Sequence, residues 1–150
     1  MPSLETMMPT KHNLFVDTSG WVCIIDQDDP LHAQGRTLYR KAIGQKRQLV
    51  TTNYIIAELV ALLESRKLVN RQEIFAFVDQ IKQSPYITVI HIDENSDAEA
   101  WQLLKQRADK AWSLVDATSF VLMQRLQLAE VITTDHHFTR AGFIRLSSPK

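Results

Sequence analysis

The sequence predicts an α/β fold with a parallel sheet of about five strands, covered by helices on both faces. Short apolar segments alternate with longer amphipathic ones along the chain. The short segments are continuously apolar, which is typical of strands buried on both faces of a parallel sheet. A chain of 150 residues, 45% of them hydrophobic, can bury one core, so disordered and fibrous classes are excluded.

The regular structure is expected to begin with a strand and a helix. Residues 14–16 form an apolar run that ends in Asp17, which predicts a short strand. Thr18 and Ser19 then offer hydroxyl groups that would cap a brief helix ending at Ile25. Asp17 is therefore expected just beyond the end of the first strand.

The next elements continue the alternation. Residues 31–44 have helical spacing with basic side chains on the outer face, and residues 48–52 predict a strand. Asn53 would cap a strongly apolar helix over residues 54–68. Another helix is expected over residues 71–82.

The second half of the chain supplies three more strands. Residues 86–92 are rich in β-branched side chains and predict a strand, after which Asn95 or Ser96 starts a helix that contains Trp101. Ser113 opens a helix that runs to about residue 128. The last two strands are expected over residues 130–134 and 142–146.

We expect one domain over residues 13–150, preceded by a disordered leader over residues 1–12. Met7 and Met8 leave open that the leader reflects an upstream start codon. Cys23 is the only cysteine, so an internal disulfide is excluded and a reducing compartment fits. No segment has the pattern of a secretory signal or the length of a membrane span, and we expect a cytoplasmic protein.

The charge balance gives no support to binding a polyanion through net charge, because 17 basic residues offset 17 acidic ones. This objection weakens if several carboxylates gather at one site around a cation. One group of basic residues would then be available for phosphates, although a solvated helix face explains it more simply. Its members are Arg36, Arg40, Lys41, Lys46 and Arg47.

Two aspartates follow predicted strands. Asp17 comes after the first strand and Asp135 after the fourth. Right-handed crossovers bring the carboxyl ends of parallel strands to one edge, where ligands bind. Either residue alone is explained as a turn former or a helix cap, but together they indicate a site.

Two further acids are placed by helices. Glu58 lies on or beside the buried stripe of an apolar helix, where an unpaired charge is costly unless it has a function. Asp116 stands three residues after Ser113, which is also the spacing of a capping box. Asp116 could serve both as a helix cap and as a member of the acid site, since the first turn of that helix points toward the same sheet edge.

Four carboxylates brought close together would repel one another unless a cation lies among them. Oxygen ligands select a hard ion, and Mg²⁺ or Mn²⁺ is the natural occupant. Such a site is suited to phosphodiester hydrolysis by metal-activated water. Whether one or two ions bind stays open.

Four blocks, FVDTSGW, TTNYIIAELVALL, WSLVDATSFVLM and VITTDHHF, occur in an order and at intervals that resemble the PIN-domain ribonucleases. Within them the chain looks most like the VapC-type toxins of toxin-antitoxin pairs. The resemblance spans residues 14–146. It implies a three-layer α/β/α sandwich, Mg²⁺- or Mn²⁺-dependent endoribonuclease activity on RNA, frequent homodimers and an antitoxin protein as partner.

The resemblance also implies roles for five residues. Asp17 and Asp116 would be the principal metal ligands, and Asp135 would complete the metal shell. Glu58 would also face the metal and would hold or deprotonate the attacking water. Ser19 would orient Asp17 or a bound water.

One position departs from the family pattern. Many relatives carry a second acid two residues after the fourth one, where this chain has His137. His136 and His137 could contact a phosphate or a softer metal, but paired histidines in a polar turn are more often simply exposed. Thr52 and Asn53 could touch substrate, although helix capping is the simpler role.

The three tryptophans, Trp21, Trp101 and Trp112, could stack on bases, although two lie in apolar helical settings that favour core packing. Two phosphate-handling folds fit poorly: a haloacid-dehalogenase phosphatase would need an aspartate at Ser19, and a phospho-receiver would need an acidic pair at the first strand. Two alternatives stay open, a non-catalytic RNA- or protein-binding PIN module and a housekeeping RNA-processing nuclease.

Overall fold

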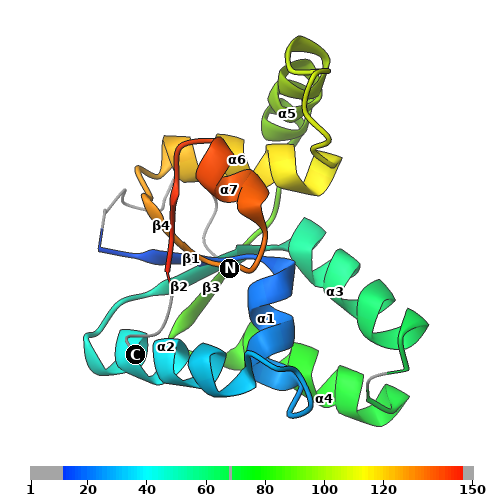
Figure 1. Ribbon diagram of the computed structural model, residues 1–150, viewed down its shortest axis with the longest axis vertical. Coiled ribbons are helices and arrows are strands. Elements are labelled where there is room, and N and C mark those ends of the chain that lie inside the picture. The colour runs from blue at the N-terminus through cyan, green and yellow to red at the C-terminus, as the bar shows by residue number, and fades with distance from the viewer. Residues whose placement is uncertain (1–11, 68, 147–150) are drawn as a thin grey trace.

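The computed structural model describes residues 12–67 and 69–146 (Figure 1). Within these residues the strands are β1 (Leu14–Val16), β2 (Leu49–Thr52), β3 (Ile87–Ile90), β4 (Glu130–Ile132) and β5 (Ile144–Arg145). The helices are α1 (Thr18–Ile25), α2 (His32–Gly44), α3 (Asn53–Ser65), α4 (Arg71–Gln83), α5 (Glu94–Gln106), α6 (Leu114–Arg125) and α7 (His136–Arg140). The predicted alternation of strands and helices is confirmed.

The five strands form one parallel sheet in the order β3-β2-β1-β4-β5. β1 lies in the centre, where Phe15 pairs with Val50 on one side and Val131 on the other. All three residues of β1 are buried, as their continuous apolar run predicts. The strand order changes direction at β1, so the carboxyl ends of β1 and β4 mark the crevice where ligands bind in such sheets.

Helices cover both faces of the sheet (Figure 1). α1 to α4 lie on one side, and α5 to α7 lie on the other, which is the expected α/β/α arrangement. α5 packs on α6 through a small cluster that includes Ala100, Ala117 and Val121. α5 projects beyond the sheet at the top of the view (Figure 1).

Gly20 allows α1 to lie directly against β4. A Cβ atom at this position would come within 2.2 Å of the carbonyl oxygen of Ile132. Backbone atoms of β4 cannot move aside cheaply, so a side chain at position 20 would push the helix away from the sheet. The contact fixes the start of α1 next to the end of β4.

Several predicted helix starts are shifted because a neighbouring residue makes the cap. Thr52 caps α3 by accepting a hydrogen bond from the Ile55 N–H, whereas Asn53 accepts one from the Ile92 N–H. Asp93 caps α5, not Asn95 or Ser96. The prediction for Ser113 was correct.

The hydroxyl groups of Thr18 and Ser19 do not cap α1. Asp17 is the cap residue by backbone geometry, and it makes no side-chain capping bond. The prediction of hydroxyl caps was therefore wrong. Both hydroxyls are instead directed into the site described below.

Some element ends also differ from the predictions. α3 ends at Ser65, and Leu68 lies outside the described residues. The helix that Ser113 opens ends at Arg125. α7 was not predicted, because five residues are too few to show helical periodicity.

Residues 1–11 of the expected leader lie outside the described residues. His12, its last residue, is described, and its carbonyl accepts a hydrogen bond from Arg47. A search of the described helices finds none that is both long and apolar enough to span a membrane.

Candidate active site

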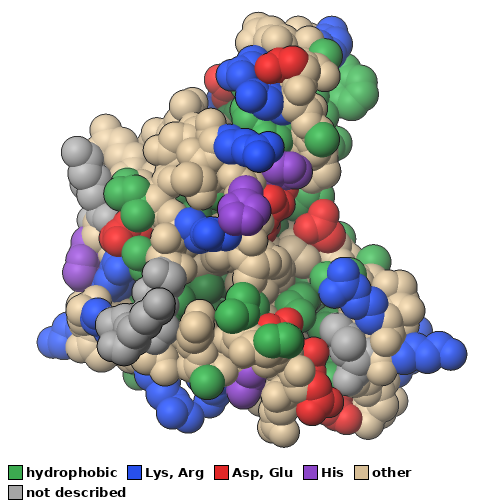
Figure 2. Space-filling model, viewed as in Figure 1, with side chains coloured by type: hydrophobic (Ala, Val, Ile, Leu, Met, Phe, Trp, Pro, Cys, Tyr) green, Lys and Arg blue, Asp and Glu red, His purple; other side chains and the backbone are tan. Residues whose placement is uncertain are grey.

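One pocket of about 550 Å³ is lined by all four acids that the sequence singled out. Asp17 follows β1 and Asp135 follows β4, so both stand at the carboxyl edge of the central strands. Glu58 reaches the pocket from α3 and Asp116 from the first turn of α6. In the space-filling view, acidic and histidine side chains gather beneath the projecting α5, with basic side chains around them (Figure 2).

Asp17 is the most deeply buried of the four, with 4% of its surface exposed. Its Oδ2 accepts a hydrogen bond of 3.1 Å from the Thr133 hydroxyl. The pKa of Asp17 is raised from 3.8 to about 7, chiefly by burial, with smaller contributions from the negative charges of Asp116 and Glu58 that together outweigh the hydrogen bonds lowering it. The site therefore holds a carboxyl group that favours protonation or a cation.

Ser19 links the ends of β1 and β4. Its Oγ lies 2.9 Å from the Thr133 Oγ1 and 3.5 Å from the Asp17 Oδ2, and it accepts a hydrogen bond from the Thr134 N–H. Thr133 also accepts a hydrogen bond from the Asp135 N–H. These bonds hold the two aspartates of the sheet edge in fixed relation. Thr133 was not among the predicted site residues, although it stands two residues before Asp135.

Glu58 has a neutral partner. The Thr18 hydroxyl donates to Glu58 Oε1 at 2.5 Å, which ties α3 to the first turn of α1. Thr18 is buried, and Glu58 is half-buried at the pocket wall. A hydroxyl group carries no charge, so this hydrogen bond positions the Glu58 carboxylate without forming an ion pair.

Asp116 makes the capping box considered from the sequence and also lines the pocket. It forms a capping box with Ser113, since the Asp116 N–H donates to the serine hydroxyl and the Ser113 N–H donates to Asp116 Oδ2 at 3.0 Å. The same Oδ2 atom faces the His137 Nδ1 at 3.2 Å. The capping box thus fixes the orientation of a carboxylate that lines the pocket.

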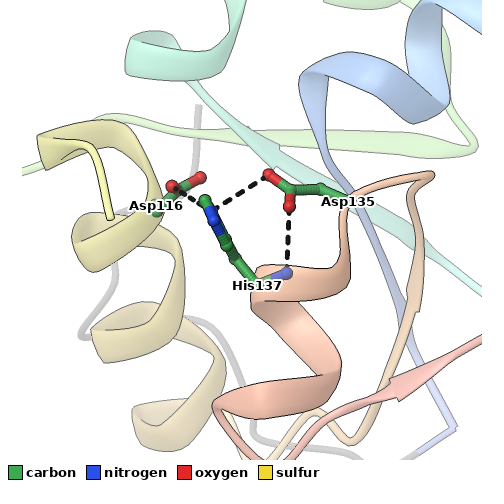
Figure 3. A group of neighbouring side chains, drawn as sticks. All are labelled: Asp116, Asp135 and His137. Atoms are coloured by element: carbon green, nitrogen blue, oxygen red, sulfur yellow. Dashed lines mark hydrogen bonds and ion pairs between the residues drawn. The ribbon is translucent and has the colours of Figure 1, made fainter. Parts of the chain in front are cut away.

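His137 lies between two of the acids (Figure 3). Its Nδ1 is 3.2 Å from Asp116 Oδ2 and 3.4 Å from Asp135 Oδ2, and its backbone N–H donates to Asp135 Oδ1. The side chain is 28% exposed and lines the pocket, so the interpretation of His137 as an exposed turn residue was wrong. His136 is exposed and does not line the pocket, as expected.

Basic residues at the pocket differ from those that the sequence suggested. Arg66, just beyond α3, lines the acid pocket, whereas the basic cluster within residues 36–47 does not. Arg36 and Arg40 instead line a separate cavity of about 390 Å³. Arg47 forms an ion pair of 2.7 Å with Glu130. Arg66 was missed because its position beyond the helix end has no sequence pattern of its own.

The pocket includes two more residues that sequence reasoning did not assign to it. Asp29 lines the pocket, and its Oδ1 accepts a hydrogen bond from the Leu31 N–H. Cys23 also lines the pocket, and burial raises the pKa of its thiol to about 11. Asp29 thus adds a fifth acid to the pocket lining.

The tryptophans divide between core and surface. Trp21 is 2% exposed, and its indole N–H donates to the Thr51 hydroxyl. Trp112 packs edge-on against Phe120 and is half-buried. Trp101 is 54% exposed on α5, which leaves it available for contact with another molecule.

The donor set of the pocket fits a divalent cation. Four carboxylates converge there, and Asp116, Asp135 and His137 each present a donor atom within 4.8 Å of the others. The raised pKa of Asp17 shows how strongly burial and crowding oppose a fully ionised cluster without a counter-charge. A bound cation would remove this opposition, because it offsets several negative charges at once.

Comparisons with known proteins find relatives that match most of this chain. Two curated relatives, both 23S rRNA-specific endonuclease VapC20 from strains of Mycobacterium tuberculosis, are 28% identical over 133 residues, which cover 89% of this chain and 97% of theirs. The crystal structure of M. tuberculosis VapC20, a sarcin–ricin loop cleaving toxin, matches with a TM-score of 0.81 and 26% identity, covering 90% of this chain and 99% of that one.

A more distant solved structure shares the fold alone. FitAcB from Neisseria gonorrhoeae matches with a TM-score of 0.60 and 18% identity, over 88% of this chain and 94% of that one. The family model described as the PIN domain matches residues 14–144, from the first strand to the last. This chain therefore belongs to the PIN domain family.

Proposed function

We propose that the protein is a divalent-metal-dependent endoribonuclease that hydrolyses RNA phosphodiester bonds and acts as the toxin of a toxin-antitoxin pair. The observation that carries the proposal is the pocket at the carboxyl edge of β1 and β4, which Asp17, Glu58, Asp116 and Asp135 line together. Membership of the PIN domain family and the similarity to VapC20 support the reaction class.

In this proposal Asp17, Asp116 and Asp135 hold the ion, which is Mg²⁺ or Mn²⁺. When bound, the ion supplies neutralising charge and a water of lowered pKa for attack on phosphorus. Glu58 lines the same pocket, where its carboxylate would orient the water and accept its proton. The Thr18 hydroxyl keeps Glu58 in place, and Ser19 and Thr133 hold Asp17.

The proposed substrate is RNA, and its phosphates would meet Arg66 at the pocket wall. A guanidinium that lines the same pocket as the acids can hold a phosphate that the carboxylates alone would repel. The relative VapC20 is a 23S rRNA-specific endonuclease that cleaves the sarcin–ricin loop. We therefore propose 23S rRNA, with that loop, as the first RNA to test.

The proposal includes an antitoxin protein that blocks the pocket, a homodimer, and a cytoplasmic location where RNA is available. The relative VapC20 is itself a toxin, which supports an antitoxin partner. The exposed Trp101 on the projecting α5 offers an apolar contact for a second copy. Light scattering of the purified protein measures the oligomeric state directly.

The decisive experiment is cleavage of a panel of RNAs, including 23S rRNA, transfer RNA and unstructured RNA, with Mg²⁺ or Mn²⁺. The wild type should cut in a metal-dependent manner, and Asp17→Asn and Asp116→Asn should remove the activity. Asp79→Asn changes an exposed carboxylate on α4 and should leave cleavage intact. If the wild type binds metal tightly but cuts none of the RNAs, a non-catalytic binding module is favoured instead.

A cutting enzyme is either a toxin or a housekeeping RNA-processing nuclease, and expression in cells separates these roles. Induction of the wild type should arrest growth, whereas induction of Asp17→Asn should not. Growth at the normal rate, together with RNA cleavage in vitro, would favour the housekeeping nuclease. Co-expression of a short neighbouring open reading frame that restores growth would identify the antitoxin.

A further inference from the structure

We propose that His137 is a nitrogen ligand of the metal centre and shifts its preference from Mg²⁺ toward Mn²⁺. The inference rests on the metal-dependent function proposed above and adds one residue to its carboxylates. Mg²⁺ keeps oxygen ligands, whereas transition-metal ions accept an imidazole nitrogen more readily. A histidine at this place therefore bears on which ion the site holds.

The geometry places one nitrogen between two carboxylates. The His137 Nδ1 lies 3.2 Å from Asp116 Oδ2 and 3.4 Å from Asp135 Oδ2 (Figure 3). The two acids come from different elements, α6 and the end of β4, and the histidine comes from α7. Three separate segments thus direct donor atoms to one point.

These separations match those of atoms that share one metal ion. Neighbouring ligands of an octahedral ion at ~2.1 Å lie ~3.0 Å apart, and those of a tetrahedral ion at a similar distance lie ~3.4 Å apart. The observed distances of 3.2 and 3.4 Å fall at this spacing. An ion could therefore take the place of the Nδ1 proton with small movements, and the imidazole would carry its proton on Nε2.

The backbone around His137 holds the ring in position. Its N–H donates to Asp135 Oδ1 at 2.9 Å, so α7 begins on the same carboxylate that the ring faces. The next residue, Phe138, is fully buried against Phe15 and Phe120 and anchors the short helix. The backbone of His137 is thus held in place by Asp135 and by the buried Phe138, while its ring lines the pocket.

A simpler role for His137 would be to hold the two carboxylates by hydrogen bonds without touching the ion. The two roles differ in what surrounds the bound metal. A ligand places nitrogen in direct contact with the ion, whereas a hydrogen-bonding histidine does not. His136 is a matched control, because it is the same residue type on the same helix but is exposed and outside the pocket.

The test is pulsed electron paramagnetic resonance of the protein loaded with Mn²⁺. The wild type should show modulation from directly bound ¹⁴N, and labelling its histidines with ¹⁵N should replace that modulation by the ¹⁵N pattern. His137→Asn should remove the nitrogen coupling and weaken Mn²⁺ binding at least ~10-fold, while His136→Asn should leave both unchanged. His137→Asp should lower the preference for Mn²⁺ over Mg²⁺ by ~10-fold in calorimetric titration.

Failure of this inference can be told apart from failure of the proposed function. Wild type that cleaves RNA with Mn²⁺ but shows no histidine nitrogen on the ion would overturn the ligand role alone. Loss of the nitrogen coupling in His136→Asn, but not in His137→Asn, would do the same. Wild type that neither binds Mn²⁺ nor cleaves RNA would overturn both. The labelling experiment needs no substitution, so a variant that fails to fold does not affect it.

Discussion

Replacing Asp17 by asparagine should make the metal-free protein more stable, and increasingly so as the pH rises. In the folded protein, burial and the nearby acids raise the pKa of this carboxyl from 3.8 to about 7. In the unfolded chain the pKa of this carboxyl is near 3.8. Between pH 3.8 and about pH 7 the folded state therefore binds more protons than the unfolded state. The free energy of unfolding therefore falls as the pH rises through this range, and the full cost is present above pH 7.

The magnitude follows from the size of the pKa change. Raising the pKa from 3.8 to about 7 corresponds to about 4 kcal/mol of lost stability above pH 7. Asparagine has the same shape without the charge, and its oxygen can still accept the hydrogen bond from Thr133. The gain in stability from Asp17→Asn should consequently be about 3 kcal/mol larger at pH 8 than at pH 5.

Urea unfolding in the presence of a chelator, followed by circular dichroism, measures this difference. The variant and the wild type are compared at both pH values, so the effects of other titrating groups cancel. Asp79→Asn, on the exposed face of α4, should show no such dependence on pH. A stability gain that is equal at pH 5 and pH 8, or a loss at pH 8, would refute the account of Asp17 as a crowded, buried acid.

Three further substitutions test other parts of the site. Glu58→Gln should reduce the single-turnover cleavage rate by ~10²-fold or more without weakening RNA binding, and an unchanged rate would exclude Glu58 as proton acceptor. Arg66→Ala should weaken RNA binding and lower the slope of log affinity against log salt by about one; an unchanged slope would remove Arg66 from the phosphate path. Gly20→Ala should cost about 1–3 kcal/mol in urea unfolding, whereas Gly44→Ala, which meets no atom within 4 Å, should cost nothing.

The fold was predictable because its main features have local causes. Continuous apolar runs specify strands buried on both faces, and the Ser113–Asp116 spacing specifies the start of α6. Thr18 and Asn53 were wrongly predicted to cap helices because each side chain has a partner elsewhere in the fold. Glu58 accepts from the Thr18 hydroxyl, and the Ile92 N–H donates to Asn53. Such choices depend on tertiary neighbours that the local sequence does not contain.

The candidate site was predictable as a set of acids but not in its details. The position of Asp17 and Asp135 after strands was enough to place them at one edge. His137 was misjudged because its neighbours in sequence are polar, while the short helix α7 turns its ring toward Asp116. Asp135 as a helix cap was the one signal that could have indicated α7, since its Oδ1 accepts from the His137 N–H.

Gly20 also bears on how nucleases with this architecture are recognised from sequence. Gly20 has no side chain that could bind metal or substrate, but the lack of a side chain sets the distance between the first helix and the fourth strand. A chain that kept every acid and carried a bulky residue there would hold Asp17 and Thr133 apart. The four acids would then be present in the sequence but would not lie together in the fold. A glycine three residues after the first acid is therefore a useful sequence criterion. Chains that have it can bring the acids into one pocket, and chains with a bulky residue there cannot.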